Sequence, residues 1–240
     1  MNVLEPFELI EMMIAENKNN RDLGEVDATV IPLQLIVEQQ NNSSENINLP
    51  LVSTSGQELK DVLCHRTSVR FFDRGQIDLD DVGAMLAAAT KGDQINWEAQ
   101  QEKGILLQIL VVAWRIDGLE PAIYQYDEKK HVLVKVGEAP PQEEGHVLVL
   151  QKEFSWAPAI LIVTGSLGAA LHAYGSHGYR HLLTRGGAAA HNAWLAALTL
   201  GYEGSVFAGF LPKPLSKLAK VDGYKQAQLF AFAVGNPLKV

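Results

Sequence analysis

Three apolar, β-branched runs stand out in the hydrophobic pattern of the chain. Each is six to nine residues long, which is the length of a strand buried on both faces. Two further apolar runs, Ala122–Tyr126 and His131–Val136, flank the polar segment Asp127–Lys130, and this pattern predicts a β-hairpin. The three buried strands are predicted at Leu106–Trp114, Ala159–Thr164 and Leu229–Val234.

Two helices are predicted before these strands and a third between the last two of them. Ser55 and Glu58 fit a capping box, which predicts a helix that ends near Arg66. A second helix is expected to begin after Asp78 and to end near Thr90, where a Lys-Gly pair follows. An alanine-rich helix is predicted at 187–200. Helices and strands that do not alternate regularly indicate an α+β domain.

Residues 1–50 differ from the rest, so we divide the chain into an N-terminal extension (1–50) and one domain (51–240). Met1–Glu16 has apolar residues near helical spacing, and Val30–Val37 has the composition of a strand. The polar run Gln39–Asn46 is typical of a linker. The extension fits a peptide-docking arm, a dimer arm or simple packing, and the sequence does not choose between them.

Composition narrows the class of protein. Hydrophobic residues make up 47% and charged residues 20% of the 240 positions, as in a globular protein with an ample core. The net charge of -8 argues against a nucleic-acid or anionic-membrane surface. The single cysteine, Cys64, excludes an internal disulfide and is compatible with the cytoplasm, and no apolar run reaches membrane-spanning length.

The segment Arg66–Phe72 brings two arginines, a threonine and a serine together. Guanidinium groups match phosphate oxygens in charge and geometry, and hydroxyl groups add neutral donors. The alternative is that these arginines are solvated charges at the end of a helix. The candidate phosphate-binding residues are Arg66, Thr67, Ser68 and Arg70.

Five motifs in register resemble the FMN-dependent nitroreductase superfamily, and some of them its SagB-type dehydrogenase branch. The resemblance covers roughly residues 50–238. The motifs are Arg66–Phe72 with Ile77–Val82, Asp117–Tyr126, Tyr174–Arg180, Gly187–Asn192 with Leu200-Gly201, and Val234–Pro237.

The resemblance implies an α+β fold with a mixed central sheet flanked by helices, and an intertwined homodimer with FMN at its interface. Arg66, Ser68 and Arg70, with Thr67 between them, would bind the flavin phosphate and the ribityl oxygens. Gln100 and Gln101 stand where the family has a Pro-Ser-Ala-Gly segment and offer amide contacts to the flavin. The segment 203–209 would contact the flavin from the other side through backbone amides, with the candidate residues Gly204, Ser205, Val206, Phe207 and Gly209.

The branch also implies a reaction. It includes oxidases that convert thiazolines and oxazolines in ribosomally made peptides to thiazoles and oxazoles, after a cyclodehydratase has closed the ring. A generic NAD(P)H-dependent nitroreductase or ene-type reductase is the alternative enzyme. Because the Lys-Tyr pair of many such oxidases is Ala173-Tyr174 here, a catalytically silent scaffold subunit is a third reading.

By position in the family motif, Tyr174 is assigned to proton transfer or substrate orientation. A tyrosine ordinarily ionises near pH 10, so as a base it would need a cationic neighbour. With the lysine absent, His172, His177 or Arg180 would have to fill that role. A metal site at His172, His177, His181 and His191 is not predicted, since no helix-borne carboxylate is placed with these histidines and oxygen or sulfur ligands are scarce nearby.

Overall fold

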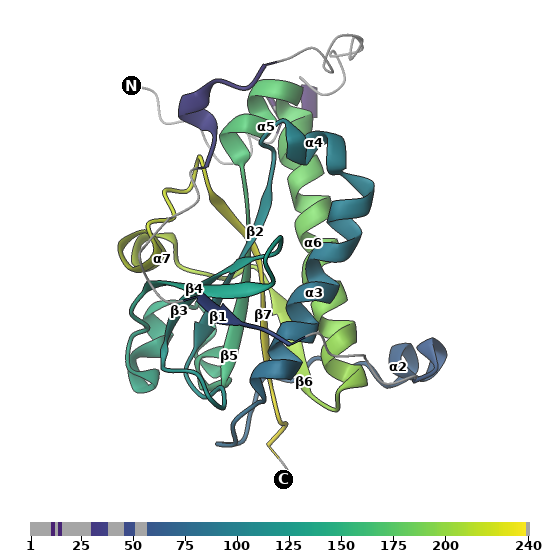
Figure 1. Ribbon diagram of the computed structural model, residues 1–240, viewed down its shortest axis with the longest axis vertical. Coiled ribbons are helices and arrows are strands. Elements are labelled where there is room, and N and C mark those ends of the chain that lie inside the picture. Colours follow the sequence, from purple (N-terminus) through teal and green to yellow (C-terminus); the bar gives the residue numbers. More distant parts are fainter. Residues whose placement is uncertain (1–10, 13, 16–29, 38–45, 51–56, 239–240) are drawn as a thin grey trace.

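The computed structural model describes residues 11–12, 14–15, 30–37, 46–50 and 57–238. Seven strands form one sheet in the order β1-β4-β3-β2-β5-β7-β6 (Figure 1). We expected a mixed sheet, but every ladder between these strands is antiparallel, and the parallel pairings in the described part are isolated bridges. The strands are β1 (Asn46–Asn48), β2 (Leu107–Ala113), β3 (Ala122–Asp127), β4 (Val132–Gly137), β5 (Ala159–Gly165), β6 (Glu203–Phe207) and β7 (Ala227–Gly235).

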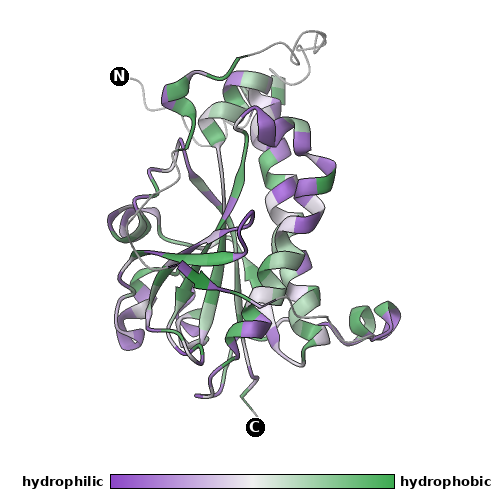
Figure 2. Ribbon diagram, viewed as in Figure 1, coloured by the Kyte–Doolittle hydropathy of each residue, from purple (hydrophilic) through white to green (hydrophobic). Residues whose placement is uncertain are grey.

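The five strands predicted between residues 106 and 234 are confirmed within two residues, because their apolar runs are largely buried in the sheet. Along β2, Leu107, Ile109 and Val111 pack toward the long helices, whereas Leu110 and Val112 pack into a second core on the opposite face. Figure 2 shows the resulting hydrophobic colour along the central strands. β6, which is less apolar, was not predicted as a strand.

Two long helices, α3 (Leu79–Asn96) and α6 (Ser176–Thr199), lie side by side against one face of the sheet (Figure 1). The opposite face is covered by α7 (Pro212–Ala219) and two 3-10 turns. The remaining elements are α2 (Leu59–His65), α4 (Glu98–Glu102), α5 (Leu167–Tyr174), and the 3-10 turns η2 (Leu33–Leu35), η3 (Gln142–Val147) and η4 (Lys152–Trp156).

Helix α3 begins after Asp78 as expected, but the prediction that it ends near Thr90 is wrong. A glycine near a predicted helix end is a common stop signal, and here Gly92 has another use. A methyl group at Gly92 would lie 3.3 Å from the side-chain amide of Asn192 on α6. The glycine therefore permits close packing of the two long helices, and α3 continues to Asn96.

One prediction for residues 1–50 is wrong, and most of the others lie outside the described residues. The strand expected at Val30–Val37 is wrong: this segment forms the turn η2, preceded by Pro32, with Val30 and Leu33 exposed. Most of the predicted helix 1–16, the cap residue Ser55 and most of the predicted linker fall outside the described residues, although Asn46 belongs to β1. Among the described helices, none combines the length and hydrophobicity needed to span a membrane.

Candidate functional site

The segment that follows α2 runs beside the edge strand β6. The backbone N–H of Val69 donates to the carbonyl oxygen of Gly204 at 3.0 Å, and Ser68 and Gly204 form a parallel bridge. Thr67, Ser68 and Arg70 are exposed. The pairing therefore fixes the predicted phosphate-binding residues against one end of β6, with their polar groups open to solvent.

Arg66 is held by a tryptophan. Its guanidinium carbon lies 4.5 Å from the centre of the Trp194 ring, a distance typical of a cation–π contact. Trp194 is buried in the face of α6 that packs on the sheet. Stacking occupies the face of the guanidinium group and leaves its in-plane N–H donors for an anion.

At Gly204 the neighbouring strand β7 leaves no room for a side chain on β6. A methyl group at this position would lie 2.2 Å from the carbonyl oxygen of Ala233 in β7, so only glycine fits. Further along, Phe207 stacks on Phe154 at 4.1 Å, and Gly209 accepts a backbone hydrogen bond from Leu150. The structure thus groups Gly204 and the buried Ser205 with Arg66 and Ser68, and carries the end of the predicted flavin-contact segment away from them.

A second group of predicted residues lies where α5 meets α6. Helix α5 ends at Tyr174, and Gly175, with φ of 55°, turns the chain into α6. The ring of Tyr174 lies 5.2 Å from that of His181, which in turn lies 5.5 Å from the ring of Trp97. His172 is exposed and His177 is half-buried.

Two imidazole nitrogens in this group are buried and have no hydrogen-bond partner among the described residues: Nε2 of His177 and Nδ1 of His181. Burial lowers the pKa of His181, and the charges of His177, Arg185 and Arg180 lower it further. No three histidine, cysteine or acidic side chains in the described part of the chain are grouped as a metal site requires.

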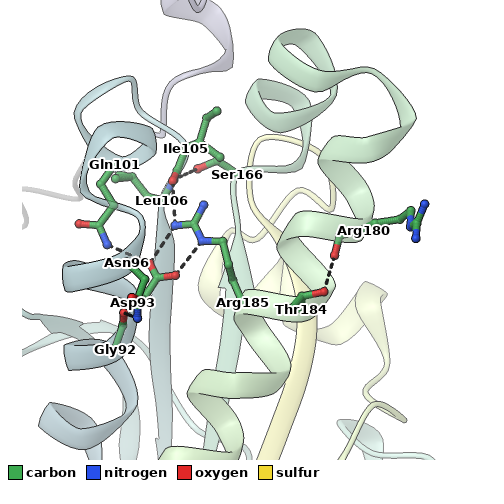
Figure 3. A network of polar contacts seen from close by, with 10 residues as sticks. All are labelled: Gly92, Asp93, Asn96, Gln101, Ile105, Leu106, Ser166, Arg180, Thr184 and Arg185. Atoms are coloured by element: carbon green, nitrogen blue, oxygen red, sulfur yellow. Dashed lines mark hydrogen bonds and ion pairs between the residues drawn. The ribbon is translucent and has the colours of Figure 1, made fainter. Parts of the chain in front are cut away.

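A buried ion pair stands behind these rings. Nε of Arg185 lies 2.7 Å from Oδ1 of Asp93, and Nη2 lies 2.8 Å from Oδ2, so the pair is bidentate (Figure 3). Nη2 also donates to the carbonyl oxygen of Ile105. The side-chain amide of Gln101 donates to Asp93 at 2.8 Å. One of the two glutamines predicted to contact a flavin thus already has an internal partner.

The two groups lie toward opposite ends of α6. Trp194, which holds Arg66, follows His181 by 13 positions, and at 1.5 Å per residue this is about 20 Å along the helix axis. Figure 1 shows the same separation, with α2 at one end of α6 and α4 and α5 at the other. Within one chain, the set formed by Arg66, Thr67, Ser68 and Arg70, called the arginine group below, therefore does not meet Tyr174.

Comparison with known proteins identifies the family. A profile of the nitroreductase family matches residues 63–236, well over half of the chain. The chain belongs to the nitroreductase family. A protein of Methanocaldococcus jannaschii that is named as a nitroreductase is 29% identical over 174 residues, which cover 70% of this chain and 86% of the relative.

Solved structures share the fold. A nitroreductase-type protein from Ralstonia eutropha aligns with a TM-score of 0.65 at 20% identity, over 83% of this chain and 93% of that one. One from Anabaena variabilis gives 0.64 at 22% identity, and this chain spans 38% of its length. A chain of the Escherichia coli microcin synthetase complex McbBCD, solved with truncated pro-MccB17 bound, gives 0.59 at 16% identity over 99% of both chains.

Sequence reasoning missed four residues of the second group. Trp97, His181, Asp93 and Arg185 were not assigned to the site, although His181 had been noticed among the histidines considered as metal ligands. Their association depends on the packing of α3 against α6, which no local pattern reveals. The one signal available in the sequence was Arg185 itself, which stands just before the predicted alanine-rich helix 187–200, because an arginine packed among small apolar residues requires a partner.

Proposed function

We propose that this nitroreductase-family chain is an FMN-dependent oxidoreductase that dehydrogenates thiazoline or oxazoline rings in a ribosomally made peptide. Family membership and the whole-length likeness to a chain of the microcin synthetase complex support this proposal. The observation that carries it is the pair Tyr174 and His181. Ring dehydrogenation must remove a proton, and a half-buried imidazole that its surroundings keep neutral is available to accept one.

The donors around Arg66 fit the phosphate end of FMN. A half-buried arginine stacked on Trp194, a second arginine at Arg70 and two exposed hydroxyl groups form a cationic, donor-rich surface. In this proposal Arg66, Thr67, Ser68 and Arg70 hold the phosphate and ribityl oxygens, and the flavin supplies the hydride acceptor that side chains lack. Of the ring-contact residues expected from the family, Gly204, Ser205 and Val206 lie on β6 next to this surface, whereas Gln100 and Gln101 lie on α4 with the Tyr174 group.

A homodimer is part of the proposal. His181, which contacts Tyr174, and Trp194, which holds Arg66, lie about 20 Å apart along α6, too far for both groups to serve one flavin within a chain. A two-fold related copy can place the arginine group of one chain against the Tyr174 group of the other. The peptide substrate and a cyclodehydratase that prepares it are the further partners that this reaction implies.

The test begins with the purified protein, which we expect to be yellow and to release FMN on denaturation. Arg66→Ala/Arg70→Ala should lose most of the bound FMN, because two charge-assisted phosphate contacts disappear. Arg74→Ala, at a neighbouring exposed arginine, is the matched control and should retain it. A double variant with full flavin content would show that the phosphate binds elsewhere.

The choice of electron donor separates the activities. Under anaerobic conditions, a thiazoline-containing peptide should bleach the flavin absorbance in a single turnover. Rapid bleaching by NAD(P)H alone would instead support the reductase reading, which the name of the archaeal relative favours. Protein that carries no flavin would support a scaffold role and contradict the proposal.

A further inference from the structure

His181 contacts two aromatic rings that come from different elements. Tyr174 at the end of α5 and Trp97 after α3 both make tilted contacts with its imidazole, at interplanar angles of 49° and 53°. Contacts with rings from two different elements restrict rotation of the imidazole. The imidazole therefore has a defined orientation beside the hydroxyl-bearing ring of Tyr174, whereas His172, the other candidate on α5, is exposed.

The surroundings of His181 favour its neutral form. An imidazolium carries a hydrogen on both ring nitrogens, and Nδ1 is buried without an acceptor among the described residues. Protonation there would leave an N–H group without a hydrogen bond. The facing titratable or charged groups are Tyr174 from α5, His177, Arg180 and Arg185 from α6, and Asp93 from α3 behind Arg185.

Arg185 connects this arrangement to the interior of the protein. Its guanidinium carbon lies 5.3 Å from the centre of the Trp97 ring, while Asp93 and the carbonyl oxygen of Ile105 hold the guanidinium in place. The same cation contributes to the low pKa of His181. Arg185 thus positions one of the rings against His181 and opposes a positive charge on it.

We infer that His181 is the group that accepts the substrate proton, and that Arg185, fixed by Asp93, is its positioning residue. This inference rests on the proposed function and names its base. The Cα–H bond of the azoline ring breaks, its electron pair becomes the new Cα–Cβ double bond, and its proton goes to the half-buried imidazole of His181. FMN, when bound, would supply the acceptor for the hydride that leaves Cβ, and with it the ring would lose two electrons. Tyr174 orients the ring through its hydroxyl group.

The first experiment measures anaerobic single-turnover flavin reduction by a thiazoline-containing peptide across pH. For the wild type, the rate should rise with pH through the pKa of His181, which lies below the ordinary value of 6.5, and then level off. His181→Gln should retain FMN, lose this pH dependence and react about a hundredfold more slowly at pH 7. His146→Gln, at an exposed histidine of η3, is the control and should behave as wild type.

The second experiment follows the charge of His181 without any turnover. The ¹³C shifts of labelled histidine rings are titrated by NMR, with His181→Gln to assign the signal. In Asp93→Asn/Arg185→Gln the pKa of His181 should rise, because a nearby cation is removed. The pH range over which the rate rises (the pH limb) should shift upward by the same amount. If Arg185 and Asp93 had a purely structural role, this double variant would change the free energy of unfolding but neither the pKa of His181 nor the pH limb of the rate.

The outcomes separate this inference from the proposed function. If the peptide fails to reduce the wild-type flavin, the proposed function falls and the inference with it. If the wild type reacts but His181→Gln stays within about threefold and keeps the pH limb, only the inference is overturned. A His181 pKa at or above 6.5 in the wild-type protein would also overturn it.

Discussion

Arg185 of α6 and Asp93 of α3 form a bidentate ion pair in the interior, with Nε to Oδ1 at 2.7 Å and Nη2 to Oδ2 at 2.8 Å. The two side chains are only 1% and 6% exposed, so water screens the pair very little. The pair joins the two long helices at the end that carries Trp97 and His181. It therefore links the packing of the helices to the geometry of the candidate site.

Removing one partner of this pair should destabilise the protein strongly. Arg185→Gln leaves the Asp93 carboxylate buried without a cation, and we expect a loss of about 3–5 kcal/mol in the free energy of unfolding. Asp93→Asn/Arg185→Gln removes both charges and should lose less than the sum of the two single changes. Urea unfolding of the four proteins measures this coupling.

Lys130→Gln is the control for that series. Lys130 pairs with Asp127 at 3.2 Å, but its side chain is 63% exposed, so we expect little change in stability. If the losses in unfolding free energy of the two single variants add up to the loss in the double variant, Arg185 and Asp93 are not coupled.

Alanine substitutions at two glycines of α6 should have opposite effects on the stability of the protein. A methyl group at Gly178 would lie 2.1 Å from the carbonyl oxygen of Ala170 in α5, which is backbone and cannot move aside cheaply. Gly178→Ala should therefore destabilise the protein by more than about 2 kcal/mol and disturb the junction that places Tyr174. Thermal unfolding and the Tyr174–His181 NMR contacts report the two effects.

Gly187→Ala provides the matched change in the same helix. A methyl group there meets no atom closer than Phe230 at 3.6 Å, an ordinary contact distance. Alanine in a helix interior should increase stability by up to about 1 kcal/mol relative to glycine. Equal destabilisation of both variants would contradict the packing of α5 on α6.

The sequence predicted strands better than helix ends, and the reasons are physical. Strands buried on both faces have continuous apolar runs, so β2, β5 and β7 were found from composition alone. The end of α3 was predicted wrongly because Gly92 serves packing rather than termination. At Val30–Val37 the apolar residues indicated a strand, but Pro32 opens a 3-10 turn instead.

Within the site, local motifs located single residues but not their partners. Tyr174 and the arginine segment were found because each belongs to a contiguous pattern. His181 reaches Tyr174 only because Gly175 reverses the chain between α5 and α6. Arg185 and Asp93 are 92 positions apart, and their pairing follows from the contact of two long helices. Such relationships require the fold.

Glu203 in β6 should make stability depend on pH. Its Oε2 is buried without a partner among the described residues, and desolvation raises the pKa of this carboxyl. A carboxyl whose pKa is raised on folding stabilises the protein fully below the pKa of the unfolded chain. That contribution is lost as the pH rises through the folded-state pKa, so the ionised group is unfavourable at pH 7.

Glu203→Gln should consequently raise the unfolding free energy at pH 7, and its advantage should vanish below about pH 4.5, the ordinary glutamate value. Denaturant unfolding at pH 7 and pH 4, at equal flavin content, measures the difference. Glu144→Gln, at an exposed glutamate, should show no such pH-dependent gain. A Glu203→Gln variant that is less stable at pH 7 would mean that the carboxylate has a partner that stabilises its charge.

Tyr174→Phe tests how the tyrosine acts beside His181. The substitution keeps the ring that contacts the imidazole and removes only the hydroxyl group, so FMN should be retained. If the hydroxyl orients the substrate through one hydrogen bond, single-turnover flavin reduction should slow by about three- to tenfold, with an unchanged pH dependence. A loss of about a hundredfold together with loss of the limb would assign the proton transfer to Tyr174 instead. Tyr179→Phe, at a more exposed tyrosine of α6, controls for the loss of a hydroxyl group. A Tyr174→Phe rate within threefold of wild type would show that the hydroxyl does not contact the reacting ring, leaving the aromatic contact with His181 as the role of this residue.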